Sequence, residues 1–144
     1  MMRCMIDTNI ILDVFLDQEP FCAASKEVLR LCEARKIVGL ISASSVTDLF
    51  YIVRKRLQST EKAYAAMEQV MNIVGILPVT PEDIQTAFLR HARDFEDCLI
   101  ATCAVSNHCD AIVTRNQADF VSFGVPLLSP EEIAGSSSEW NIIH

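Results

Sequence analysis

The feature that most constrains this chain is an aspartate, Asp7, at the end of the first apolar run. Cys4-Met5-Ile6 is typical of a buried strand, and Asp7 is followed at once by apolar residues at helical spacing. Open parallel sheets bind their ligands beyond the carboxyl ends of the strands, where Asp7 would stand. The start of the chain therefore predicts an α/β fold with a functional carboxylate at the first strand exit.

Three later segments also place acidic and other polar residues at predicted strand ends or helix starts. They are Ser44-Ser45-Val46-Thr47-Asp48, Asp94-Phe95-Glu96-Asp97 and Val113-Thr114-Arg115-Asn116-Gln117-Ala118-Asp119. Parallel strands expose their carboxyl ends on one edge of the sheet, so we expect the fold to bring these segments together. The result would be a pocket lined by carboxylates.

Apolar periodicity divides the chain into short strands that alternate with amphipathic helices. The predicted strands are 2–6, 38–41, 76–79, 111–114 and 125–128, and the helices between them include 45–57, 60–73, 81–93 and 94–107. This alternation is typical of one three-layer α/β domain with a mostly parallel, short-stranded sheet flanked by helices. We expect the domain to span 1–134 and residues 135–144, which are rich in Gly and Ser, to form a flexible tail.

Composition agrees with a single globular domain that carries a strong negative charge. The 144 residues are 51% hydrophobic, which is enough for a sizeable core. No run approaches the ~18 apolar residues of a membrane span, and the first strand begins at once, so we expect no signal peptide and no membrane partner. The six cysteines contain no Cys-x-x-Cys pair, which favours free thiols of a cytoplasmic protein.

Each acid also has a structural explanation, because acids are common at helix starts. Asp7 can cap the helix that follows it, and Ser45-x-x-Asp48 and Asp94-x-x-Asp97 both resemble capping boxes. For any single position, capping and function are equally good explanations. Capping does not explain why several such helix starts would face one crevice.

Clustered carboxylates are destabilising without a counter-ion. Two of them ~5 Å apart repel by roughly 3 kcal/mol at an effective dielectric constant of ~20, and a helix N-terminus recovers only ~0.3–1 kcal/mol. Oxygen ligands without a nearby His or Cys suit Mg²⁺ or Mn²⁺. A net charge of −7 argues against broad attraction to nucleic acid, but a cation held by the acids reverses the local sign. The pattern favours metal-assisted phosphodiester hydrolysis.

The ordered motifs of the chain resemble those of the PIN domain family. They are Met5-Ile6-Asp7-Thr8-Asn9, Ile41-Ser42-Ala43 leading to Asp48-Leu49-Phe50-Tyr51, Asp94-Phe95-Glu96-Asp97-Cys98-Leu99-Ile100-Ala101, and Val113-Thr114-Arg115-Asn116 with Asp119-Phe120. PIN domains are metal-dependent nucleases, most often ribonucleases, and many small ones are VapC-type toxins paired with an antitoxin. The resemblance implies a Mg²⁺- or Mn²⁺-dependent endoribonuclease with RNA as substrate and an antitoxin as a candidate partner. We expect a homodimer and favour single-stranded RNA, because a splayed strand offers its phosphate to a narrow pocket.

The resemblance implies a catalytic set of four residues. Asp7 matches the first metal-binding acid of the family, and Asp97 matches the acid that begins the later helix. Asp48 stands where the family usually has Glu, so its carboxylate is retracted by about one methylene. Asn116 stands where many members have a fourth Asp, which removes one charge but keeps a carbonyl oxygen.

Further polar residues complete the expected site. Asp94 and Asp119 are additional acids that we assign to the metal-binding set with Asp7, Asp48 and Asp97. Asn9 and Thr114 are expected to orient carboxylates or water, and Arg115 to contact a substrate phosphate.

One other function remains open, and another is disfavoured by the residues. The short Asp48 and the neutral Asn116 also fit a catalytically weak PIN-like module that binds nucleic acid or a partner. A haloacid-dehalogenase-like phosphatase is disfavoured, because it needs a second Asp where this chain has Asn9. Arg54-Lys55-Arg56 is typical of a solvated helix face, although it could meet RNA phosphates, and Tyr51 could either pack in the core or stack on a base.

Overall fold

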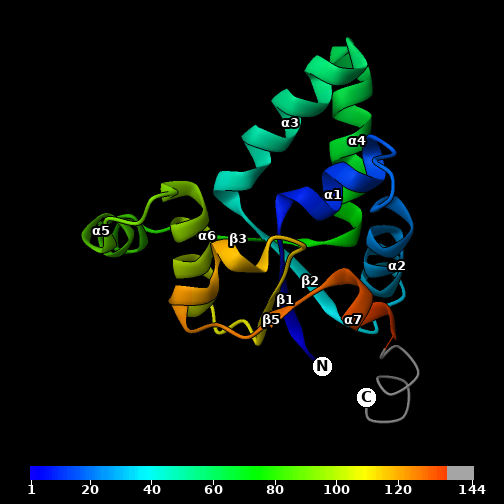
Figure 1. The fold of residues 1–144 in the computed structure, drawn as a ribbon. Coiled ribbons are helices and arrows are strands. Elements are labelled where there is room, and N and C mark those ends of the chain that lie inside the picture. Colours follow the sequence, from blue (N-terminus) through cyan, green and yellow to red (C-terminus); the bar gives the residue numbers. More distant parts are fainter. Residues whose placement is uncertain (136–144) are drawn as a thin grey trace.

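The computed structural model describes residues 1–135 and shows a parallel sheet with helices on both faces (Figure 1). The strands are β1 (Arg3–Ile6), β2 (Val38–Ser42), β3 (Gly75–Leu77), β4 (Ala111–Val113) and β5 (Leu127–Leu128). The helices are α1 (Thr8–Phe15), α2 (Cys22–Glu33), α3 (Ala43–Leu57), α4 (Thr60–Ile73), α5 (Pro81–Arg90), α6 (Phe95–Ser106) and α7 (Pro130–Gly135), with two short 3-10 turns, η1 (Gln117–Asp119) and η2 (Val121–Phe123). The predicted three-layer α/β domain is confirmed.

The strand order places the end of β1 where an open sheet binds its ligands. Over the described residues the order is β3-β2-β1-β4-β5, and every neighbouring pair is parallel. The chain moves outward from β1 through β2 to β3, and then returns to the other side of β1 for β4 and β5. The strand order therefore reverses at β1, and ligands bind at such a switch point. Asp7 directly follows this strand.

Alternate side chains of β1 enter two separate hydrophobic cores. Cys4 and Ile6 pack with buried residues of α1, α2, α3, α4 and α7, whereas Met5 packs with buried residues of α6. In Figure 1, α5 and α6 accordingly lie on one side of the sheet, and α2, α4 and α7 lie on the other. Because successive strand residues face opposite sides, a single apolar strand anchors both layers. The edge where β1 ends is thus held rigidly between two cores.

Helix α5 ends three residues earlier than the sequence pattern predicts. His91 has a φ of 50°, in the left-handed region that terminates helices, so α5 stops at Arg90. Ala92 and Arg93 then form a short connection to Asp94, the N-cap of α6. Arg93 is therefore presented on a connecting segment beside the start of α6 and does not lie on a helix.

The predicted tail falls almost entirely outside the described residues. Its first residue, Gly135, is the last residue of α7, and 136–144 are not described, so the predicted boundary and flexibility stay predictions. Among the helices of residues 1–135, none is long and apolar enough to cross a membrane.

Candidate active site

Asp7 is fixed at the carboxyl end of β1 by two hydrogen bonds. Its Oδ1 accepts from the backbone N–H of Thr8 at 2.7 Å, and its Oδ2 accepts from the hydroxyl of Thr114 at 2.8 Å. Thr114 is fully buried just after β4, and its hydroxyl oxygen also accepts from the backbone N–H of Asn116 at 3.0 Å. The ends of β1 and β4 are thus joined by a buried hydrogen bond that holds one carboxylate, and the role of Thr114 in the site stays a prediction.

The pKa of Asp7 lies above its usual range. Burial is the main cause, and the nearby charge of Asp119 adds to it. The hydrogen bonds from Thr114 and Thr8 act in the opposite direction, because they stabilise the ionised form. Asp119, at the end of η1, is therefore close enough to Asp7 for the two carboxylates to repel each other.

Asp97, in the first turn of α6, connects the remaining acids to this pair. Its pKa is raised to about 7 by partial burial and then by the charges of Asp94, Asp7 and Asp119. Asp94 caps α6, since its carboxylate accepts from the backbone N–H of Asp97 at 3.0 Å. Four carboxylates from three distant segments therefore share one electrostatic environment, as the motifs led us to expect.

Asp48 lies apart from these four and interacts with Glu96. It projects from the second turn of α3 and is exposed. Partial burial, a hydrogen bond with Asp48 and the charges of Asp48, Asp94 and Asp97 raise the pKa of Glu96 to about 7. Glu96 thus bridges Asp48 to the acids around Asp97. Glu96 was not among the predicted site residues, although its place in the acidic run 94–97 was a signal.

The N-cap explanation holds for Asp7 and Asp94, but at Asp94-x-x-Asp97 only the bond to the Asp94 carboxylate is present among the described residues, and not the reciprocal bond of a capping box. Asp7 and Asp94 do accept hydrogen bonds from the first turns of α1 and α6. The capping box proposed at Ser45-x-x-Asp48 is wrong, because α3 begins earlier, after Ser42, and the Ser45 hydroxyl is buried 2.8 Å from the Ser42 hydroxyl. Capping therefore gives no account of Asp48.

These oxygen groups match a hard divalent cation in their chemistry. A cation would relieve the repulsion among Asp7, Asp94, Asp97 and Asp119. Asn9 has a buried Oδ1 with no hydrogen-bond partner among the described residues, an acceptor that a metal-bound water would satisfy. Within 1–135, however, no group of three His, Cys, Asp or Glu side chains is close enough to hold one ion together. The assigned catalytic and ligand roles therefore stay predictions for Asp7, Asp48, Asp94, Asp97, Asp119 and Asn116.

Arg115 is engaged in an ion pair inside the protein. Its Nε and Nη2 each donate to a different carboxylate oxygen of Asp13 at 2.9 Å, and its guanidinium carbon lies 3.9 Å from the ring centroid of Phe21. Asp13 is fully buried on α1 and also accepts from the hydroxyl of Ser25 at 2.9 Å. This network ties the segment after β4 to α1 and α2. The predicted contact of Arg115 with a phosphate finds no support in this arrangement.

Asp13 is a second residue that sequence reasoning missed. Its signal was a single acid within the apolar stretch 10–15. A buried acid of this kind requires a partner, but the pattern of the stretch does not say where in the chain that partner lies.

The fold and the acidic crevice at its switch point define a PIN-type α/β domain, and comparison with known proteins agrees. The chain belongs to the PIN domain family, whose model matches residues 3–118. It is 25% identical over 146 residues to Ribonuclease VapC1 of Aquifex aeolicus (strain VF5), covering 98% of this chain and 97% of that protein. The resemblance inferred from the motifs is therefore confirmed, and it extends to the VapC ribonucleases.

Solved structures with the same fold include VapBC proteins. A DNA-bound VapBC from Salmonella typhimurium has a TM-score of 0.69 at 22% identity, covering 90% of this chain and 99% of that chain. A toxin–antitoxin complex from Klebsiella pneumoniae has a TM-score of 0.63 at 23% identity, with 90% and 99% covered. At these identities the likeness establishes the fold.

We expect Asp13→Asn to lower the free energy of unfolding by about 3 kcal/mol, because a buried ion pair loses one partner and leaves the other unpaired. Ser25→Ala removes one hydrogen bond to the same carboxylate and should cost about 1 kcal/mol. Urea denaturation at pH 7 measures both variants. Equal, small losses from the two substitutions would show that the pair does not stabilise the fold.

We also expect the metal-free protein to lose stability as the pH rises from 5 to 8. Asp97 releases its proton near pH 7 in the folded protein but near 3.8 in an unfolded chain, so the folded state binds more protons in this window. Thermal unfolding in EDTA should show a shallower pH dependence for Asp97→Asn than for wild type. Glu68→Gln, on the exposed face of α4, should keep the wild-type slope. An unchanged slope in Asp97→Asn would refute the raised pKa.

Proposed function

We propose that this chain is a Mg²⁺- or Mn²⁺-dependent endoribonuclease that hydrolyses RNA phosphodiesters and acts as the toxin of a toxin–antitoxin pair. One observation carries the proposal: Asp7, Asp94, Asp97 and Asp119 come from distant segments, yet their charges act on one another at the switch point of the sheet. Kinship with VapC ribonucleases supports RNA as the substrate class.

In this proposal Asp7 and Asp97 are the principal metal ligands. A bound ion would supply Lewis acidity toward the scissile phosphate and lower the pKa of a coordinated water. Thr114 keeps the Asp7 carboxylate in one orientation through its 2.8 Å hydrogen bond. Asp119 supplies the negative charge that the neutral Asn116 lacks, because it acts on both principal ligands.

Asp48 and Glu96 extend the negative region from α6 toward α3. Both side chains line the groove between α3 and the start of α6, and the charge of Asp48 acts on Glu96. We assign Asp48 to the rim of the site, where it contributes charge through Glu96. The longer reach of Glu96 compensates for the methylene that Asp48 lacks.

The decisive measurement is cleavage of a fluorescent RNA with and without Mn²⁺. Wild type should cleave only with the metal, and Asp7→Asn and Asp97→Asn should each lose about 100-fold or more, the scale of removing one electrostatic group at a reacting centre. The off-site control Glu68→Gln should match wild type. Cleavage that persists in EDTA, or in Asp7→Asn, would defeat the proposal.

The alternative function is a catalytically weak PIN-like module. Two observations favour it: the described residues contain no ready-made group of three metal-binding side chains, and Asp48 interacts with Glu96. Such a module would bind RNA or a partner protein and yet show no metal-dependent cleavage. The same assay, combined with an RNA-binding measurement, separates the two functions.

Metal binding can be tested independently of activity. Millimolar Mn²⁺ should raise the melting temperature of wild type, because the ion binds the folded state and relieves carboxylate repulsion; at 100 times Kd the gain is about 2.7 kcal/mol. The rise in melting temperature should be much smaller in Asp97→Asn than in wild type, and in Glu68→Gln it should equal that of wild type. A wild-type melting temperature that is insensitive to Mn²⁺ would count against a shared metal site.

An antitoxin protein is the partner that we propose for this chain. The fold likeness to a VapBC structure and to a toxin–antitoxin complex supports this choice, and a small neighbouring open reading frame would identify the candidate. Homodimer formation and a cytoplasmic location stay predictions.

A further inference from the structure

We infer that single-stranded RNA crosses the acidic site along a track made of two grooves, one on each side of the acids. The inference rests on the proposed ribonuclease function and adds the path of the substrate. The first groove, here called the α3 groove, has a volume of about 370 Å³ and lies between α1, α3 and the start of α6. The second, the α6 groove, has a volume of about 480 Å³ and lies between the 92–94 connection and the turns after β4.

The α3 groove runs from acidic to basic along one helix face. It is lined at the site end by Asp48 and Glu96, and farther along by Tyr51 and Lys55. Residues three, four and seven apart share a helix face, and the seven residues from Asp48 to Lys55 span about 10 Å. Tyr51 is 59% exposed, and the guanidinium carbon of Arg54 lies 6.0 Å from its ring centroid. Along α3, therefore, Asp48 is succeeded by an exposed aromatic ring, Tyr51, and by the cations Arg54 and Lys55.

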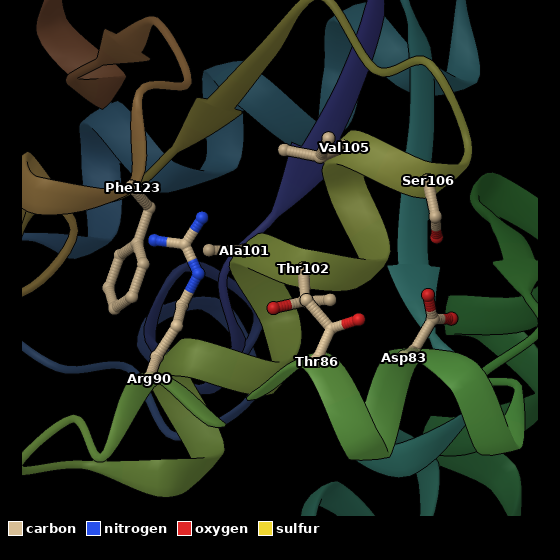
Figure 2. A pocket seen from close by; sticks show the side chains of 8 residues that line it. All are labelled: Asp83, Thr86, Arg90, Ala101, Thr102, Val105, Ser106 and Phe123. Atoms are coloured by element: carbon tan, nitrogen blue, oxygen red, sulfur yellow. The ribbon is translucent and has the colours of Figure 1, made fainter. Parts of the chain in front are cut away.

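The α6 groove repeats this arrangement on the other side of β1, because α3 follows β2, the turns after β4 line the α6 groove, and these two strands flank β1 on opposite sides. Asp94 and Asp119 line its site end, and Arg93 and Phe123 line the remainder. The guanidinium carbon of Arg90 lies 5.5 Å from the ring centroid of Phe123, and Figure 2 shows the two side chains together. This groove also begins at acids and contains an aromatic ring with cations beside it.

The pocket drawn in Figure 2 borders the track and is separate from it. It has a volume of about 240 Å³, lies between α5 and α6, and extends from Phe123 and Arg90 to Asp83 and Ser106. None of the site acids Asp7, Asp94, Asp97 or Asp119 lines it among the described residues. Phe123 lines both cavities, so its ring forms the wall between them.

The pairing of a cation with an aromatic ring in each groove points to an RNA strand as the occupant of both. Single strands bind proteins through phosphate contacts with cations and through bases stacked on aromatic rings, and each groove offers both. A chain of net charge −7 needs local cations to hold a polyanion. Arg115 is held by Asp13, so Lys55 and Arg93 supply the cations here. The α6 groove contains the site acids Asp94 and Asp119, and the α3 groove ends at Glu96, whose charge acts on Asp94 and Asp97. A strand lying in both grooves would therefore place an internal phosphate at the acids.

RNA binding in EDTA, where metal-dependent cleavage is off, tests the track. Anisotropy of a labelled, unstructured oligoribonucleotide of about 12 nucleotides measures affinity. Lys55→Gln and Arg93→Gln should each weaken binding by about threefold to tenfold and reduce the slope of log K against log salt by about 0.7. Lys36→Gln, at an exposed position that lines neither groove, is the matched control and should bind as wild type does.

Stacking is tested by a second matched pair. Tyr51→Ala should weaken binding by about tenfold, whereas Tyr64→Ala should leave it unchanged. Both tyrosines are exposed and both contact Phe50, at ring-centroid distances of 5.2 and 4.8 Å, but only Tyr51 lines the α3 groove. Thermal unfolding of each variant shows whether its fold is retained.

The outcomes separate the track from the ribonuclease proposal. If wild type cleaves RNA but the groove variants bind like their controls, the track is wrong and the ribonuclease stands. If wild type does not cleave but the groove variants lose affinity, the ribonuclease proposal fails and the track stands as a binding surface. Equal affinity for a fully double-stranded RNA of the same length would also overturn the track.

Discussion

The site depends on one buried hydrogen bond, from the Thr114 hydroxyl to Oδ2 of Asp7. It joins the ends of the two central strands, where the strand order reverses, and the same hydroxyl receives the N–H of Asn116. Asp7 and Thr114 are both buried. A hydrogen bond to a buried carboxylate is stronger than one between neutral groups, so this contact fixes the first acid and the path of the chain toward Asp119.

Around that fixed point the fold tolerates charges that oppose folding. The raised pKa of Asp97, like that of Asp7, reports carboxylates brought together and withdrawn from water. Such perturbed groups concentrate at functional sites, because a scaffold held by two cores can accept local destabilisation. The Asp13–Arg115 pair contrasts with them, since its charges are matched and bound at both oxygens. The Asp13–Arg115 pair stabilises the scaffold, whereas the acids around Asp7 and Asp97 are suited to bind a cation.

The sequence predicts what depends on local pattern. Strand and helix periodicity located the parallel sheet, and the position of Asp7 after the first apolar run predicted its place at the switch point. The partners of Asp48 and Arg115 could not be predicted in this way. Asp48 interacts with Glu96 because of how α3 is oriented toward α6. Arg115 donates hydrogen bonds to Asp13, which lies 102 residues away in the sequence. Periodicity carries no information about which long side chains meet across two layers.

Net charge is a poor guide to what this surface can bind. A net charge of −7 suggests repulsion of nucleic acid. The site acids, however, lie together at the switch point, and Lys55 and Arg93 each line one of the flanking grooves. A polyanion responds to the local field, and screening limits that field to about 8–10 Å at ordinary ionic strength. Lys55 lies about that far along α3 from Asp48, so the repulsion from the acids is weakened where the strand would be held. A divalent cation at the acids would then remove the remaining barrier at the middle of the track.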